Sequence, residues 1–317
     1  MTGHFELGHL FGQAKILVAL LYISLGIIVH MLYLPCLYAL FKLITKERRT
    51  SSCYKLMLYL GLVDCMGVSA SGYCGGIASW RGDVYCQSPI FVYSFCTLGM
   101  LAWCAGNCNT ILLSINRCMV IYDADMADRW FRGHRTLIWL CAPTFASLFF
   151  IFITPPVAFN SIDSSALFNP HMHYLPSDED FHSRYHHVHV LFNWFIVFAI
   201  LGIYTIFCVS FGRKLCYSGY NKKLLKEINT FLQVLITCAF VVFSSLGFIY
   251  QQYLKSVPVY VYASLIFYQG SPAIIYLCMN QSIRNIIFGR GYKARKASIL
   301  PSVMHRVSIM DKLDNTR

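Results

Sequence analysis

The stretch that decides the fold runs from Leu56 to Ser79 and reads LMLYLGLVDCMGVSASGYCGGIAS. Its 24 residues include a single charged side chain, that of Asp64. A helix needs about 20 mostly apolar residues to cross the hydrocarbon core of a bilayer, where no water satisfies exposed backbone groups. The stretch therefore predicts a membrane-spanning helix that carries one carboxylate deep inside the bilayer.

Six further apolar runs lie on either side of this stretch, so the sequence predicts an all-α membrane protein with a bundle of seven transmembrane helices. The predicted spans are Ile16–Phe41, Leu56–Ser79, Ile90–Val120, Thr136–Thr154, Val188–Phe211, Thr230–Tyr253 and Pro258–Met279. We expect a short extracellular N-terminus over residues 1–15 and a seven-helix domain over residues 16–279. Residues 280–317 then form a cytosolic segment, with a short amphipathic helix at Asn280–Phe288 followed by a basic tail.

The composition agrees with a membrane protein. Of 317 residues, 57% are hydrophobic and 13% are charged, whereas a soluble chain carries about 25% charged residues. This excludes a soluble enzyme, a disordered chain and a nucleic-acid-binding protein, although the net charge is +12.

The basic residues indicate how the chain crosses the bilayer. Only Lys15, Arg81, Arg184 and Lys255 lie on the side that holds the N-terminus, and the other 22 lysines and arginines fall on the opposite side. Cytoplasmic segments carry an excess of lysine and arginine. The sequence therefore predicts that the N-terminus is outside the cell and that the C-terminus is cytosolic.

Asp64 is the only carboxylate deep inside a predicted span. At 1.5 Å of rise per residue, Asn107, Asn109 and Ser271 come to about the same depth. Ionisable residues inside a membrane usually mark a functional site, so we expect a polar cluster that holds a cation or a proton on Asp64. The alternative is a neutral, hydrogen-bonded acid that only joins helices.

The cytosolic end of the third span carries Asn116 and Arg117. Arg117 either extends its charge to the lipid headgroups or pairs with an acid in a resting state and releases it on activation. Glu227, at the start of the sixth span, is the candidate partner, with Asp123 and Asp125 as competitors. In the seventh span, Pro272 predicts a kink near the level of Asp64.

Several motifs resemble the rhodopsin-like G-protein-coupled receptors, and more closely the nematode serpentine receptor class T family of chemosensory receptors. They are Leu32-Tyr33-Leu34-Pro35, Gly61-Leu62-Val63-Asp64, Asn116-Arg117-Cys118, Gly133-His134-Arg135-Thr136, Phe159-Asn160-Ser161 and Pro272-Ala273-Ile274-Ile275-Tyr276. The resemblance implies a plasma-membrane receptor, without a cofactor, that couples an extracellular small-molecule ligand to a heterotrimeric G protein.

The sequence also departs from the rhodopsin-like pattern. Asn116 stands where an acid usually precedes the arginine, Ser271-Pro272 replaces the usual Asn-Pro pair, and Tyr276 lies one place farther on. The segment 155–187 holds no cysteine to join the third span. Cys74 and Cys86 are candidates for a disulfide, whose connectivity the sequence does not fix.

Helical position on the outer half of the bundle gives candidate ligand contacts, although ordinary packing between helices would explain the same residues. The candidates are Tyr93, Thr97, Met100 and Trp103 on the third span, with Tyr250 and Tyr262 as weaker ones.

Two alternatives belong to other functional classes. An intramembrane metal-dependent hydrolase needs several ligands at one depth, but the interiors of the spans hold only His30 and Asp64. A channel or transporter gains no support, because the chain has no internal repeat. Histidines near the second outer loop suggest metal or pH sensing, but a solvated lid without metal is the expected reading. They are His171, His173, His182, His186, His187 and His189.

Overall fold

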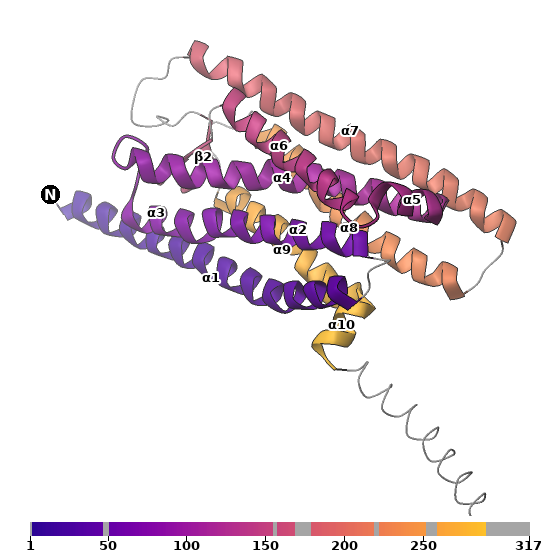
Figure 1. Cartoon of the computed structure of the whole chain (residues 1–317). Helices are drawn as coiled ribbons and strands as arrows, with labels where there is room; N and C mark the ends of the chain where they lie inside the picture. The colour runs from indigo at the N-terminus through magenta and orange to yellow at the C-terminus, as the bar shows by residue number, and fades with distance from the viewer. Residues whose placement is uncertain are drawn as a thin grey trace, which may run out of the picture.

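The protein is described as a computed structural model, which covers residues 2–46, 51–154, 157–168, 179–218, 222–251 and 259–289. It is helical apart from one small hairpin of two strands (Figure 1). The elements are α1 (Thr2–Lys46), α2 (Ser51–Val68), the π-helix η1 (Ser69–Cys74), α3 (Gly75–Arg81), α4 (Pro89–Tyr122), α5 (Ala124–Phe131), α6 (Arg135–Ile153), β1 (Ala158–Asn160), β2 (Ser165–Leu167), α7 (Glu179–Ser218), α8 (Lys222–Gln251), α9 (Val259–Met279) and α10 (Gln281–Ile287).

Seven of the helical segments are long and apolar enough to cross a membrane, which confirms the predicted bundle. The second of them joins α2, η1 and α3 into one span. The helix α1 begins at Thr2, well before the predicted start at Ile16. The difference arises because an apolar run marks only the part of a helix that lies inside the bilayer. A helix forms its backbone hydrogen bonds internally, so it can continue beyond the bilayer.

The helix α4 lies in the middle of the bundle, where it packs against α2, α6, α7 and α8. On the other side of α2, α1 packs against α9. Figure 1 shows the β hairpin and the start of α1 at one end of the bundle, and α10 at the other. We call these the hairpin end and the α10 end.

Apolar side chains fill the interior and also cover the outside of the bundle. Phe131, Leu56 and Ile283 are among the fully buried ones, whereas Phe152 and Phe243 are largely exposed. A soluble protein rarely exposes apolar patches above a few hundred Å². The exposed apolar residues on so many helices therefore fit a surface that faces lipid.

The hairpin lies over the bundle at its end. β1 and β2 pair antiparallel, with Phe159 opposite Ala166, and the ring of Phe159 packs against Phe95 and Tyr262. Tyr22 of α1 donates a hydrogen bond of 2.6 Å to the backbone oxygen of Ser164 in the hairpin turn. The described part of the predicted outer loop, residues 157–168, is thus a structured cover fastened to α1.

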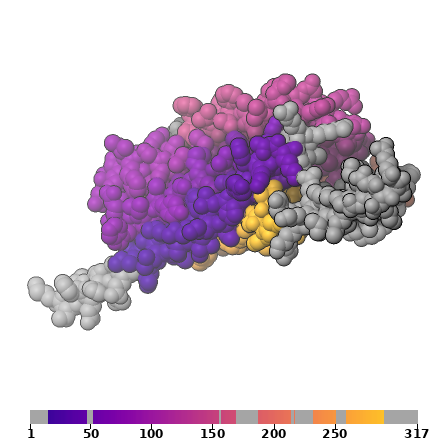
Figure 2. All heavy atoms as spheres, turned by 60° about the horizontal axis from the view of Figure 1, so that its bottom comes forward, coloured from indigo at the N-terminus to yellow at the C-terminus, as the bar shows by residue number. Residues whose placement is uncertain are grey.

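The α10 helix confirms the predicted short helix after the last span. Asn280 caps it by accepting hydrogen bonds from the backbone nitrogens of Ser282 and Ile283, at 3.1 and 3.2 Å. Ile283 is fully buried and belongs to a cluster with residues of α1 and α2. Figure 2 shows the yellow surface of α9 and α10 against the indigo and purple surface of α1 and α2.

Candidate functional site

Asp64 lies in α2 and is buried, with 5% of its surface exposed. The hydroxyl of Tyr33, from α1, donates a hydrogen bond of 2.5 Å to Asp64 Oδ2. Tyr33 is itself fully buried. The partner of the predicted intramembrane acid is therefore a phenol of the neighbouring helix rather than a basic group.

The same hydroxyl lies 3.0 Å from the backbone oxygen of Gln269 in α9. A phenol has one O–H proton, so Asp64 and the Gln269 carbonyl share it. The contact joins α1, α2 and α9 at one point. In the sequence, Tyr33 stands out only as part of the motif Leu32-Tyr33-Leu34-Pro35. The signal that marks it is a polar hydroxyl within an apolar run.

The other members of the predicted cluster are buried in the interior, but no direct hydrogen bond to Asp64 is found for them among the described residues. Asn107 Oδ1 accepts from the hydroxyl of Tyr268 at 2.7 Å, and Asn109 Nδ2 donates to the backbone oxygen of Leu56 at 3.0 Å. Equal depth places side chains at one level, but it does not decide which way each helix turns them.

Pro272 lies inside α9 and is buried. Its ring nitrogen has no proton, so the backbone oxygen of Tyr268, four residues earlier, loses its helical donor. The hydroxyl of Ser271 supplies a replacement hydrogen bond to that oxygen at 2.8 Å. In lipid such side-chain donors are the usual remedy for a proline inside a helix.

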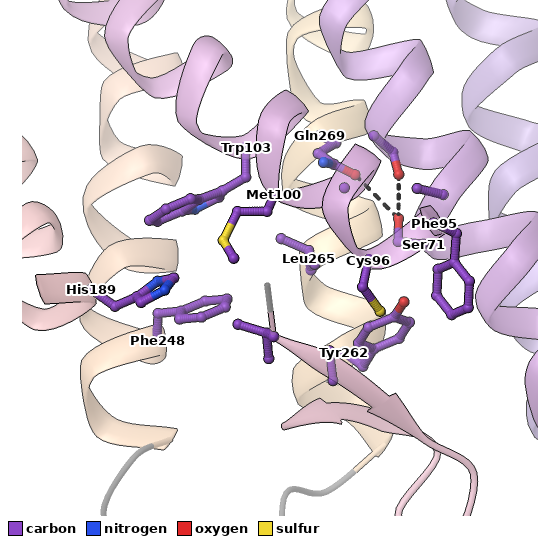
Figure 3. A pocket seen from close by; sticks show the side chains of 15 residues that line it. Ser71, Phe95, Cys96, Met100, Trp103, His189, Phe248, Tyr262, Leu265 and Gln269 are labelled. Atoms are coloured by element: carbon purple, nitrogen blue, oxygen red, sulfur yellow. Dashed lines mark hydrogen bonds between the residues drawn. The ribbon is translucent and has the colours of Figure 1, made fainter. Parts of the chain in front are cut away.

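A pocket opens between α2, η1, α4, α7, α8, α9 and the hairpin (Figure 3). Its outline takes in about 540 Å³ of space between the atoms, with the open solvent at its mouth included. The side chains and backbone that line it belong to Gly67, Ala70, Ser71, Phe95, Cys96, Gly99, Met100, Trp103, Val157, Ala166, His189, Phe248, Tyr262, Leu265 and Gln269.

The pocket contains three of the predicted ligand contacts, Met100, Trp103 and Tyr262. Tyr93 and Tyr250 are instead 48% and 65% exposed on the outside of the bundle, and Thr97 does not belong to the lining. The lining face of α4 runs through Phe95, Cys96, Gly99, Met100 and Trp103. Residues 93 and 97 project from an adjacent face, because each step along a helix turns about 100°.

One end of the pocket is aromatic. Figure 3 shows Trp103, His189 and Phe248 together there, and the rings of Trp103 and Phe248 stack with centroids 5.6 Å apart. His189 was expected in a solvated lid, but it is a buried residue of α7, with 1% exposed, against Trp103 and Phe150. His187 is exposed, and the side chains of His171, His173, His182 and His186 lie outside the described residues.

The other end of the pocket is polar and narrow. Ser71 Oγ lies 2.9 Å from the backbone oxygen of Gly67 and 3.3 Å from Gln269 Oε1. A Cβ at position 67 would overlap the Gln269 amide nitrogen, so a larger residue there would displace this amide. Ser71 belongs to the π-helix, a feature that is frequent at functional sites.

At the α10 end, an Arg117 side-chain nitrogen contacts the sulfur of the buried Cys53. Asp123, one predicted competitor for Arg117, accepts from the backbone nitrogens of Asp125 and Met126 and so caps α5. Glu227 lies in α8, but its side chain is outside the described residues, so its pairing with Arg117 stays a prediction.

Several buried polar groups near Arg117 have few partners. In the described part of the chain, the amide atoms of Asn116 and the hydroxyl of Tyr276 have no hydrogen-bond partner. Asn280 Nδ2, in contrast, donates to Gln233 Oε1 at 3.3 Å and so joins α10 to α8. That link was missed because the sequence gives no sign of which helices meet there.

Two further predictions concern cysteine and metal. Cys74 is half-buried and Cys86 exposed, and both carry thiols here, so a bond between them stays a prediction. Among the residues that the structure describes, no three His, Cys, Asp or Glu side chains gather as ligands for a metal ion.

The fold and the polar interior define the class of protein, a membrane protein with a rhodopsin-like bundle of seven helices. The bundle is similar to the crystal structure of squid rhodopsin, with a TM-score of 0.63, 15% sequence identity and 85% of each chain covered.

The family follows from the sequence. The model of the serpentine type 7TM GPCR chemoreceptor Srt family matches residues 5–295, so the chain belongs to that family. It is also 22% identical over 280 residues to serpentine receptor class T-55 of Caenorhabditis elegans, which covers 86% of this chain and 74% of the relative.

Proposed function

We propose that this chemoreceptor resides in the plasma membrane, binds an extracellular small molecule in the pocket of Figure 3, and activates a heterotrimeric G protein at the α10 end. The proposal places the N-terminus outside the cell. The excess of lysine and arginine on the opposite side supports this orientation, because such residues are retained in the cytosol.

The observation that carries the proposal is the double role of Gln269. Its side chain lines the pocket, and its backbone oxygen accepts from Tyr33, the residue bound to Asp64. A shift of α9 that accommodates a ligand therefore changes the environment of the intramembrane acid directly. Tyr33 alone links the Gln269 backbone oxygen to Asp64.

Activation is then a shift between two packings of the bundle rather than a new structure made by the ligand. The α10 end supplies the element that changes. Buried polar groups without a partner cost about 1–3 kcal/mol each, and Asn116 and Tyr276 carry such groups. A second packing that gives them partners, and that changes the contacts of Arg117, opens a surface for the G protein.

Glu227 stays the proposed resting partner of Arg117. In the sequence it comes just before the apolar part of α8, at the end of that helix that is predicted to be cytosolic. Release of that pair on ligand binding is the expected switch. Asp64, Asn107, Asn109, Ser271 and Pro272 act in this proposal as the polar interior through which α9 repacks.

A ligand screen read through G-protein activation tests the proposal. In cells that express the chain, we expect at least one small molecule to raise nucleotide exchange on a G protein, and we expect no rise in untransfected cells. An ionic current or uptake that persists when G proteins are blocked with a non-hydrolysable GDP analogue would contradict the proposal and favour a channel or transporter.

A further inference from the structure

The pocket is lined without a formal charge. None of its lining residues is Asp, Glu, Lys or Arg. A charged ligand would have to leave water for a site that offers no ion of opposite sign, which costs far more than the burial of a neutral group. The lining therefore offers no ion pair to a carboxylate or an ammonium ion.

The body of the pocket is apolar and flat on one side. The Trp103 and Phe248 rings stack at an interplanar angle of 26°, and Figure 3 shows Met100 and Leu265 between this aromatic end and the polar end. Such a wall favours an aliphatic or aromatic ligand body, because removing apolar surface from water is favourable.

The polar end presents an unused donor. Gln269 is 3% exposed, and its Oε1 already accepts from Ser71. A glutamine amide also carries two N–H donors. Among the described residues, the hydrogen bonds of the Gln269 side chain include none from its amide nitrogen. An amide donor that lines a pocket and has no protein acceptor favours a ligand that brings one.

We infer that the ligand is an uncharged, mainly apolar molecule with one hydrogen-bond acceptor oxygen, such as a ketone, an ester or an alcohol. Its oxygen binds the Gln269 amide beside Ser71, and its body lies toward Trp103 and Phe248. This inference rests on the proposed function, because it assumes that the pocket is where the receptor takes its ligand.

Binding is best measured on the full chain in nanodiscs of phosphatidylcholine, without a G protein. Four probes share a phenyl ring and differ in their polar group: acetophenone, benzoate, benzylammonium and ethylbenzene. The readout is the rise in melting temperature with probe concentration. We expect acetophenone to stabilise the protein at the lowest concentration, ethylbenzene at a higher one, and the two ions not at all.

Variants at the polar end make the test specific. We expect Ser71→Ala and Gln269→Leu each to weaken acetophenone binding about three- to tenfold, the effect of one buried hydrogen bond, and to leave ethylbenzene unchanged. Gln269→Glu places a carboxylate there and should make benzylammonium the preferred probe. Ser24→Ala removes a hydroxyl that bonds only within α1 and serves as the matched control.

Three results would overturn the inference. They are benzoate or benzylammonium binding more tightly than acetophenone to the natural protein, equal binding of acetophenone and ethylbenzene, and no stabilisation by any probe. If Gln269→Leu fails to fold, Ser71→Ala decides. Probe binding without any G-protein activation would sink the proposed function alone, whereas G-protein activation driven by a charged compound would sink only the ligand class.

Discussion

The Tyr33 hydroxyl lies 2.5 Å from Asp64 Oδ2, and both residues are buried between α1, α2 and α9. No lysine or arginine is found beside this acid in the described part of the bundle, so a neutral donor satisfies it. Because the same hydroxyl also reaches the Gln269 backbone oxygen, one side chain holds three helices in register.

Tyr33→Phe removes this donor and leaves Asp64 and the Gln269 oxygen without it. We expect a loss of about 1–3 kcal/mol of stability, the cost of unsatisfied buried groups, seen as a lower melting temperature of the purified protein. Tyr38→Phe, at an exposed position on the same helix, is the control and should melt like the natural protein. If both variants had the same melting temperature, the stabilising role assigned to Tyr33 would be wrong.

Asp64→Asn keeps an oxygen that accepts from Tyr33 but removes the carboxylate. We therefore expect normal surface expression with ligand-driven G-protein activation reduced about 5- to 150-fold, the usual range of coupling between sites. Dose–response curves for G-protein activation, together with surface labelling, measure this. Unchanged signalling would mean that Asp64 only joins helices.

Arg117→Ala removes the contact with Cys53 and the charge that we propose as a switch. We expect ligand binding to persist in isolated membranes while G-protein activation is lost, because the substitution acts at the α10 end, away from the pocket. Arg213→Ala, at an exposed position in α7, is the matched control. If both variants lost G-protein activation equally, the result would show only a general need for basic charge and would contradict a specific role of Arg117.

Gly67→Ala tests the polar end of the pocket through its shape. The added methyl group would overlap the Gln269 amide, so Gln269 must move and the contact with Ser71 is broken. We expect about a three- to tenfold loss of probe binding. The control is Gly202→Ala in α7, where a Cβ meets no atom within 4 Å and binding should be unchanged. Unaltered binding in Gly67→Ala would contradict the assigned geometry.

The sequence predicted the seven spans well, because length and apolarity are the conditions for crossing a bilayer. The depth of Asp64 was also readable. The residues that line the pocket could not be predicted, because both the lipid-facing and the interior faces of these helices are apolar. Trp103, for example, is buried, whereas Tyr93 on the same helix is exposed. Without a polar face, periodicity does not reveal which side turns inward.

Local backbone features escaped prediction for a different reason. The π-helix that carries Ser71 adds a residue to one turn and so shifts the face of the span. Its residues, Ser69–Cys74, do not distinguish a π-helix from an α-helix. The burial of His189 was missed because a histidine-rich segment suggested a solvated loop. Both depend on contacts between distant segments, which local patterns do not record.

Every role proposed here requires the two ends of the bundle to face opposite compartments. The direct test is the accessibility of epitope tags at the N-terminus and the C-terminus in living cells, before and after the plasma membrane is made permeable. We predict that the N-terminal tag is labelled on intact cells and that the C-terminal tag is labelled only after permeabilisation. Labelling of both tags on intact cells, or of neither, would contradict the account.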